Sequence, residues 1–179
     1  MDKLSKWAEN PSANDEEASQ WAKDALTSGC DGDGVPLLFS IPLSTSLVNL
    51  LQDNDVDLTA RDRSGKVILF DDTYFGEGVF SVLADYFEAK GLIDAADYEG
   101  LTPLSSYVKL GDYQKSRILL QHGATPNSVA RISRYGGASL SVVKQAILAL
   151  DSSGDNDNER VKIELLSLLK GYGMAISEA

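Results

Sequence analysis

The chain has 179 residues, with 27 acidic and 16 basic side chains and a formal net charge of −11 at pH 7. Hydrophobic residues make up 43% of it, which suits one folded domain that buries about 70% of its exposable surface. The acidic balance argues against nucleic acid and against an anionic membrane as partners, because both attract a basic face.

Cys30 is the only cysteine, so the chain cannot form an internal disulfide. A lack of disulfides is typical of a reducing compartment, and we expect a cytoplasmic protein. No basic and then apolar leader follows Met1, and Pro36 and Pro42 interrupt the apolar run at residues 35–51. We therefore expect neither a signal peptide nor a membrane span.

The negative charge is confined to one part of the chain. Residues 1–96 hold 18 acidic and 7 basic side chains, whereas residues 97–179 hold 9 of each. The whole excess of acid therefore belongs to residues 1–96. It has two interpretations, an acidic surface for a basic partner or solubility alone.

Two helix pairs are predicted before residue 62. Apolar residues at helical spacing, with Trp7 and Trp21 among them, predict a first pair in residues 1–31 with a polar outer face. The next pair begins near Pro36, in the segment VPLLFSIPLSTS, and Pro42 should break or shorten its first helix.

Tight turns mark the starts of the next two pairs. Asp62 and Gly65 have the spacing of such a turn, and Asp97 and Gly100 repeat it 35 residues later. Gly76 divides the helical pattern between the two turns into two parts.

The stretch at residues 97–127 has the clearest helical pattern. Thr102 and Pro103, in GLTPL, fit the cap and the first position of a helix. Apolar residues then recur at helical spacing on both sides of Gly111, which predicts two short amphipathic helices. Gly123, in LLQHGA, is the residue type that ends a helix in the left-handed conformation.

This stretch resembles an ankyrin repeat, in which a turn with Asp and Gly precedes TPLH, two antiparallel helices and a closing LLxxGA. Asn127 matches the Asp or Asn that follows in the family. Ser105 and Tyr107 depart from the pattern, because the family has His and Ala there, and that His ties adjacent turns by a hydrogen bond. The resemblance implies a stacked array of helical hairpins.

The last helix pair is predicted at residues 140–150 and 161–169, with an apolar side that includes Ile163 and an end at Gly171. The acidic insert at residues 151–159 is rich in turn formers, so we expect a mobile surface loop.

The expected fold class is all-α, an ankyrin-repeat solenoid of stacked helical hairpins with degenerate capping repeats. We expect a single domain over residues 1–179. Its five repeats cover approximately residues 1–31, 32–61, 62–96, 97–130 and 131–179.

The resemblance also implies where a partner binds, since variable residues of the turns and inner helices form the concave binding face of ankyrin proteins. Placed on this sequence by position, the partner-binding residues are Arg61, Arg63, Lys66, Tyr98, Glu99, Leu101, Arg131, Arg134 and Tyr135. Arg and Tyr are residue types in which binding energy concentrates. Solvated polar turns without any partner would give a similar set of residues.

Other candidate sites have simpler explanations. Asp53, Asp55 and Asp57 alternate like the start of a calcium loop, but the glycine and closing glutamate of such a loop are missing. His122, the only histidine, fits a helix end, where an imidazole can cap carbonyl groups. One His and one Cys do not make a catalytic set, so we expect no catalytic residues, no cofactor and no metal.

We expect a non-catalytic protein–protein interaction module that binds one protein partner and neither nucleic acid nor a membrane. When free, it should be a monomer. Because the repeats fill the sequence, a small stoichiometric regulator or neutralising inhibitor is favoured, for example an immunity protein against a toxin. The alternative is an acidic escort chaperone for a basic client, motivated by the charge of residues 1–96. An enzyme would require a pocket holding two carboxylates with shifted pKa values.

Overall fold

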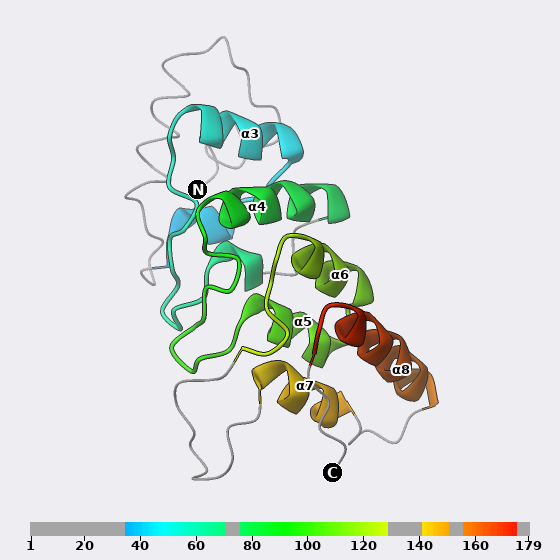
Figure 1. Ribbon diagram of the computed structural model, residues 1–179. Coiled ribbons are helices and arrows are strands. Elements are labelled where there is room, and N and C mark those ends of the chain that lie inside the picture. Colours follow the sequence, from blue (N-terminus) through cyan, green and yellow to red (C-terminus); the bar gives the residue numbers. More distant parts are fainter. Residues whose placement is uncertain (1–34, 71–75, 129–140, 151–155, 175–179) are drawn as a thin grey trace. The chain divides into compact units, whose positions relative to one another are not determined.

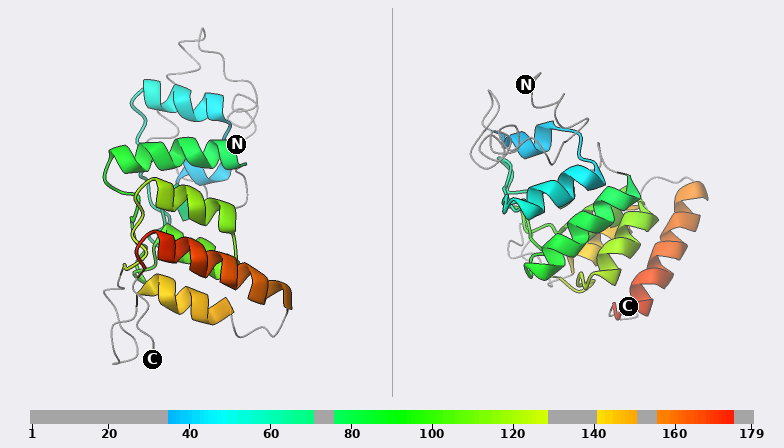
Figure 2. Two further views of the ribbon diagram at one scale, coloured as in Figure 1. Left: turned by 45° about the vertical axis from the view of Figure 1, so that its right-hand side comes forward. Right: turned by 90° about the horizontal axis from the view of Figure 1, so that it is seen from above.

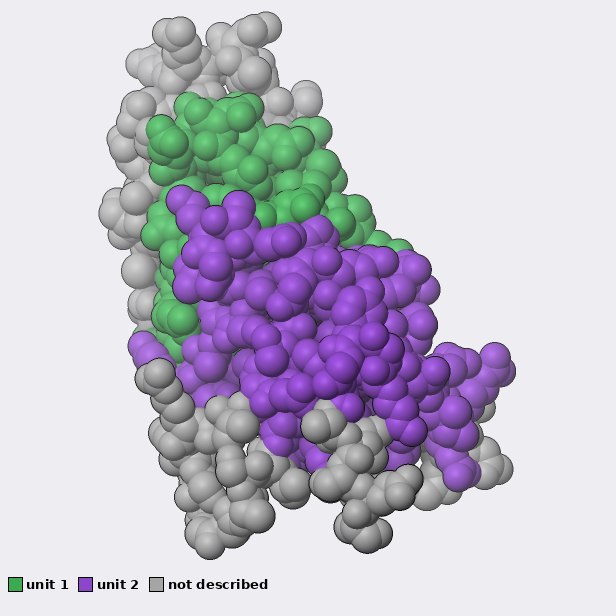
Figure 3. Space-filling model, in the orientation of Figure 1, with its two compact units in different colours: residues 1–86 green, residues 87–179 purple. Residues whose placement is uncertain are grey.

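The computed structural model describes residues 35–70, 76–128, 141–150 and 156–174, which form helices joined by turns (Figure 1). No sheet occurs among these residues, so the predicted all-α class is confirmed. None of the helices in these ranges is long and apolar enough to cross a bilayer. The chain divides into two compact units, residues 1–86 and 87–179 (Figure 3). The helix pair predicted at residues 1–31 lies outside the described residues.

In unit 1, Pro42 separates a short helix from a longer one, as predicted. The 3-10 helix η1 covers Leu37–Ser40, and the α-helix α3 covers Thr45–Asp53. The hydroxyl of Ser44 caps α3 by accepting a hydrogen bond from the amide of Leu47 (3.2 Å). The buried face of α3 consists of Leu47, Val48 and Leu51.

The next helix of unit 1 follows a short turn of 3-10 helix. This turn, η2, covers Ile68–Phe70, and α4 begins directly after Gly76 and covers Glu77–Ala89. The boundary between the units falls within α4, after Tyr86. The hydroxyl of Tyr86 accepts a hydrogen bond from the amide of Leu58 (3.4 Å), which ties α4 to the connector that follows α3.

In unit 2, helices α5 (Pro103–Leu110) and α6 (Tyr113–Gln121) occupy the predicted positions. Thr102 and Ser105 cap α5 reciprocally. Thr102 Oγ1 accepts from the amide of Ser105 (3.3 Å), and Ser105 Oγ accepts from the amide of Thr102 (3.0 Å). Ser105, which stands where the ankyrin pattern has histidine, therefore caps the start of its own helix. Gly111 ends α5 with a φ of 74°.

A second hairpin follows in unit 2, formed by α7 (Val142–Leu150) and α8 (Asn156–Gly171). The prediction of a loop through Glu159 was wrong, because α8 begins at Asn156 and not at Val161. Asn, Asp and Glu are favoured in turns and also at the first positions of helices, so composition did not separate the two.

The two hairpins of unit 2 pack side by side. Helix α5 contacts α6 and α7, and α8 contacts the same two helices (Figures 1 and 2). Leu165 and Leu169 of α8 are fully buried. Ile163, predicted on the apolar side of α8, is instead 62% exposed. In the run IELLSLL five of the seven residues are apolar and they occur on more than one side of the helix, so the pattern alone did not identify the inward face.

Five helices end in the same motif, in which an amide just past a left-handed residue donates to a carbonyl five positions earlier. The donor and acceptor pairs, 2.8–3.0 Å apart, are Val56 and Leu51, Leu92 and Phe87, Asp112 and Tyr107, Ala124 and Leu119, and Met174 and Leu169. The left-handed residues are Asp55, Gly91, Gly111, Gly123 and Gly173. A Cβ at Gly123 would meet no atom within 4 Å, so its positive φ and not a lack of space requires glycine.

Leu119→Ala tests the helix phase of the α5–α6 hairpin. Leu119 is fully buried, so its loss should lower the free energy of unfolding by about 2–5 kcal/mol in a urea titration. Leu110, which is 60% exposed, provides the matched control, and its replacement by Ala should cost less than about 0.5 kcal/mol. Equal losses in the two variants would contradict the assigned phase.

Asp55→Gly should stabilise the protein. Asp55 is the one residue other than glycine with a positive φ (57°) among the described residues, and its charge lies at the carboxyl end of α3. Glycine should raise the free energy of unfolding by about 0.5–1 kcal/mol, because it removes the backbone strain and the unfavourable charge. Asp55→Asn removes only the charge and should gain less, whereas Asp55→Ala should lower the melting temperature. A melting temperature that rises in the Ala variant would argue against strain at this position.

Candidate partner-binding turns

The predicted turn of unit 1 is closed by one aspartate. Asp62 Oδ1 accepts from the amides of Ser64 and Lys66, both at 2.8 Å. The amide of Asp62 donates to the carbonyl of Lys66 (2.9 Å), and the amide of Gly65 donates to the carbonyl of Asp62 (3.0 Å). Gly65 has a φ of 80°, which explains the glycine at this position.

The predicted turn of unit 2 repeats these hydrogen bonds one by one. Asp97 Oδ1 accepts from the amides of Glu99 and Leu101, both at 2.9 Å. The amide of Asp97 donates to the carbonyl of Leu101 (2.9 Å), and the amide of Gly100 donates to the carbonyl of Asp97 (3.0 Å). Gly100 has a φ of 83°. The repeat of the Asp and Gly turn is therefore confirmed at the level of individual atoms.

This bonding decides what the turns can offer a partner. In unit 2 the amides of Asp97, Glu99, Gly100 and Leu101 all donate within the turn. Asp97 is only 8% exposed, so its carboxylate is enclosed by the loop that it organises. The surface of the turn accordingly consists mainly of side chains.

The three predicted binding residues of unit 1 have different surroundings. Nη1 of Arg61 donates to the carbonyl of Gly65, which holds the guanidinium across the turn. The amine of Lys66 lies 5.9 Å from the centre of the Phe70 ring, at the outer limit of a cation–π contact. Arg63 is exposed and meets no partner among the described residues. Of the three cations of this turn, Arg63 has the fewest contacts with other described residues.

The predicted binding residues of unit 2 differ in exposure. Tyr98 is 66% exposed, Glu99 is exposed, and Leu101 is half-buried. Tyr98 directly follows the turn aspartate, which is the position that Arg63 holds in unit 1. The same backbone frame therefore carries a cation in one unit and an aromatic ring in the other. The remaining predicted residues, Arg131, Arg134 and Tyr135, lie outside the described residues.

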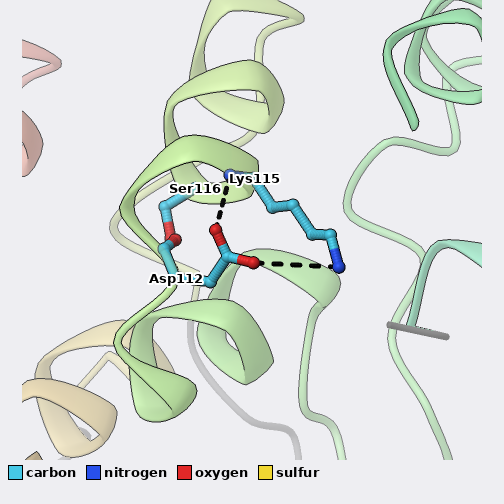
Figure 4. A network of polar contacts seen from close by, with 3 residues as sticks. All are labelled: Asp112, Lys115 and Ser116. Atoms are coloured by element: carbon cyan, nitrogen blue, oxygen red, sulfur yellow. Dashed lines mark hydrogen bonds and ion pairs between the residues drawn. The ribbon is translucent and has the colours of Figure 1, made fainter. Parts of the chain in front are cut away.

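The α5–α6 hairpin buries a lysine that the sequence did not single out. Lys115 is 8% exposed, and its amine lies 3.7 Å from Asp112 Oδ2 and 4.9 Å from the centre of the Tyr107 ring. Asp112 Oδ1 also accepts from the amide of Lys115 (2.9 Å), and the hydroxyl of Ser116 donates to the carbonyl of Asp112 (2.7 Å) (Figure 4). The fully buried Tyr107, a departure from the ankyrin pattern, thus faces a cation.

Two contacts tie the end of the α5–α6 hairpin to the last turn of α4 and to the connector that follows α4. Nδ1 of His122 lies 2.8 Å from Oε2 of Glu88, 34 positions away. The amide of Thr125 donates to both carboxylate oxygens of Asp94 (3.1 and 3.0 Å), 31 positions away. Sequence reasoning missed both pairs, because neither spacing carries a local signal. It had assigned His122 only a capping role at its own helix.

Asp94 has a pKa that is shifted by its surroundings. Burial raises the pKa of Asp94 above its ordinary value, because removal from water disfavours the charged carboxylate. The hydrogen bonds from the side chain and the amide of Thr125 act in the opposite direction. The ionised form of Asp94 is therefore less stable, relative to its protonated form, than that of an exposed aspartate.

Comparison with known proteins does not add to this geometry. No protein-family model matches the chain, and no curated protein is significantly similar to it.

The pKa of Asp94 predicts a pH effect on stability. Asp94 holds its proton more tightly in the folded state, so its contribution is full below about pH 4 and is lost as the pH rises through the folded pKa. The asparagine side chain of Asp94→Asn cannot ionise. As the pH rises from about 4 through the folded pKa of Asp94, the variant should therefore gain stability relative to the native protein. Urea titrations of both proteins between about pH 3 and pH 7 measure this difference. A difference that stays constant or falls with pH would contradict the assignment.

Proposed function

We propose that this chain is a non-catalytic binding module of the ankyrin-repeat type, which engages one protein partner through the side chains of its turns. The observation that carries the proposal is the pair of turns at Asp62 and Asp97. Their hydrogen bonds are the same, whereas their exposed side chains differ. A conserved frame with variable residues at its surface is what a repeat-based binding surface requires.

The spacing and the hairpin support the ankyrin reading. The two turn aspartates are 35 residues apart, close to the repeat length of about 33 in ankyrin arrays. The second turn leads directly into α5, capped by Thr102 with Pro103 at its first position. Helix α6 then ends at the glycine of the LLQHGA motif. Turn, two short helices and a glycine stop follow one another in the order that the family uses.

The rigidity of the turns supports binding as the activity. Ordering flexible side chains and loops on association opposes binding, so a turn that is already closed by its own hydrogen bonds loses little entropy. A partner would then meet Tyr98 and Leu101 in positions that require little rearrangement. Tyr combines a large apolar ring with a hydroxyl and has few rotatable bonds, which makes it a common anchor residue.

Two roles fit such a module. In the first, the chain is a small stoichiometric regulator or neutralising inhibitor whose binding blocks a mature, active protein. In the second, it is an escort for a basic client, and the charge of −11 on residues 1–96 favours this role. The state of the bound protein separates them, because a regulator holds a folded and active partner and an escort holds a newly made one.

Tyr98→Ala combined with Leu101→Ala should weaken partner capture without unfolding the chain. The native protein, this double variant and Leu110→Ala are each immobilised and exposed to native cytosol at low and high salt. Bound proteins are identified by mass spectrometry. We expect one dominant partner on the native chain, at least about tenfold less of it on the double variant, and no loss on the control.

Matched melting curves establish that all three proteins are folded. Equal capture by the double variant and the native protein would show that the turn of unit 2 is not the binding surface. If the native protein retains no partner above background, the proposal of a binding module fails.

A further inference from the structure

Charge is sharply segregated in the described part of unit 1, residues 35–70 and 76–86. All of its basic residues, Arg61, Arg63 and Lys66, lie within one turn of six residues. The acidic residues of the same ranges are Asp53, Asp55, Asp57, Asp62, Glu77 and Asp85. Only Asp62 among them belongs to the turn. Among these described residues, the basic side chains are therefore confined to one turn.

The single acid of the turn is occupied by the backbone. Asp62 directs Oδ1 at the amides of Ser64 and Lys66, both 2.8 Å away. Its role in closing the turn explains its presence among three cations. Closing the turn does not require basic residues, since the equivalent turn of unit 2 has the same hydrogen bonds from its aspartate and its backbone without one.

The cations are also differently placed. Arg61 is held across the turn by its bond to the carbonyl of Gly65, and Lys66 lies beside the Phe70 ring. Arg63 follows the turn aspartate, is exposed and meets no partner among the described residues. A guanidinium on a preformed turn is well suited to paired hydrogen bonds with a carboxylate, because its planar fork matches the two oxygens.

We propose that the turn at residues 61–66 docks an acidic patch of the partner protein, with Arg63 bonded to a partner carboxylate. Arg61 and Lys66 supply the surrounding positive field. This inference rests on the proposed binding function and adds the chemistry of the partner at this turn. A partner with an exposed acidic patch fits a folded, regulated protein better than it fits a uniformly basic client.

A polyanionic nucleic acid is the other source of negative charge and is disfavoured. Sequence-independent binding to nucleic acid typically uses about 6–10 phosphate contacts, and this turn has three cations. Three cations on a rigid turn match a few carboxylates on a protein surface.

Arg63→Glu tests the contact, and Arg117→Glu is its matched control. Arg117 is an exposed residue of α6, and each change moves the net charge from −11 by the same amount. With the partner captured by the native chain as probe, Arg63→Glu should weaken binding at least about tenfold, because it places like charges together. Arg63→Gln should weaken it less, and Arg117→Glu should leave it near the native value.

Several outcomes overturn the inference while the binding function stands. Equal affinity of the native chain and of folded Arg63→Glu would exclude the contact, as would equal losses in Arg63→Glu and Arg117→Glu. Capture that disappears after nuclease treatment would assign the turn to nucleic acid. If the native chain captures no partner at all, the proposed function fails and the inference fails with it.

Cross-linking gives an independent test that does not depend on weakened binding. Arg63→Lys keeps the charge and supplies a primary amine, and a carbodiimide joins such an amine to a carboxylate only when the two are in contact. We expect a cross-linked peptide between position 63 and an Asp or Glu of the partner, identified by mass spectrometry. Cross-links confined to other lysines of the chain, with binding intact, would contradict the placement of Arg63.

Discussion

The hydrogen bonds from two backbone amides to one aspartate carboxylate are the constraint on which each of the two candidate turns depends. In unit 2, Asp97 is nearly excluded from solvent and accepts from Glu99 and Leu101. Hydrogen bonds to a charged group contribute about 1.5–3 kcal/mol each, which is large for a loop of five residues. The carboxylate accepts the amide hydrogen bonds that a carbonyl group of a helix or sheet would otherwise accept. Side chains at the tip, such as Tyr98, are thereby freed from any role in closing it.

Tertiary packing, rather than intrinsic helix stability, holds the elements behind these turns. Helices α5 and α6 have 8 and 9 residues, well below the length at which an isolated helix is stable in water. Each must bury its apolar face against a neighbour, and sharp stops such as Gly111 and Gly123 allow the chain to reverse in time to do so. The buried Lys115 completes the hairpin, since its stem packs inside while its amine meets Asp112 and the Tyr107 ring.

Features with a local cause could be predicted from the sequence, and features that join distant residues could not. The start of α5 at Thr102 and Pro103 follows from capping chemistry over four positions. The contact between His122 and Glu88 has no such signal, because 34 positions separate the two residues. The exposure of Ile163 belongs to the same class, since five of the seven residues in IELLSLL are apolar and the neighbouring helices decide which side is buried. For the candidate site, the sequence predicted the turns. It did not predict that Arg61 would be bonded to the carbonyl of Gly65 whereas Arg63 would be exposed without a contact to the described residues.

The hydrogen bonds within the turns limit how a partner could be recognised. Most backbone amides of these turns are already bonded within the turn, which disfavours the addition of a strand or the binding of an anion in a nest of amides. A partner of the proposed module would therefore meet mainly side chains, and here the two frames differ, with Arg63 in one and Tyr98 in the other. A cation selects for negative charge, and an aromatic ring selects for an apolar hollow with a polar rim. Each turn, taken within its own unit, would therefore favour a partner surface of different chemistry, since specificity is a difference between affinities.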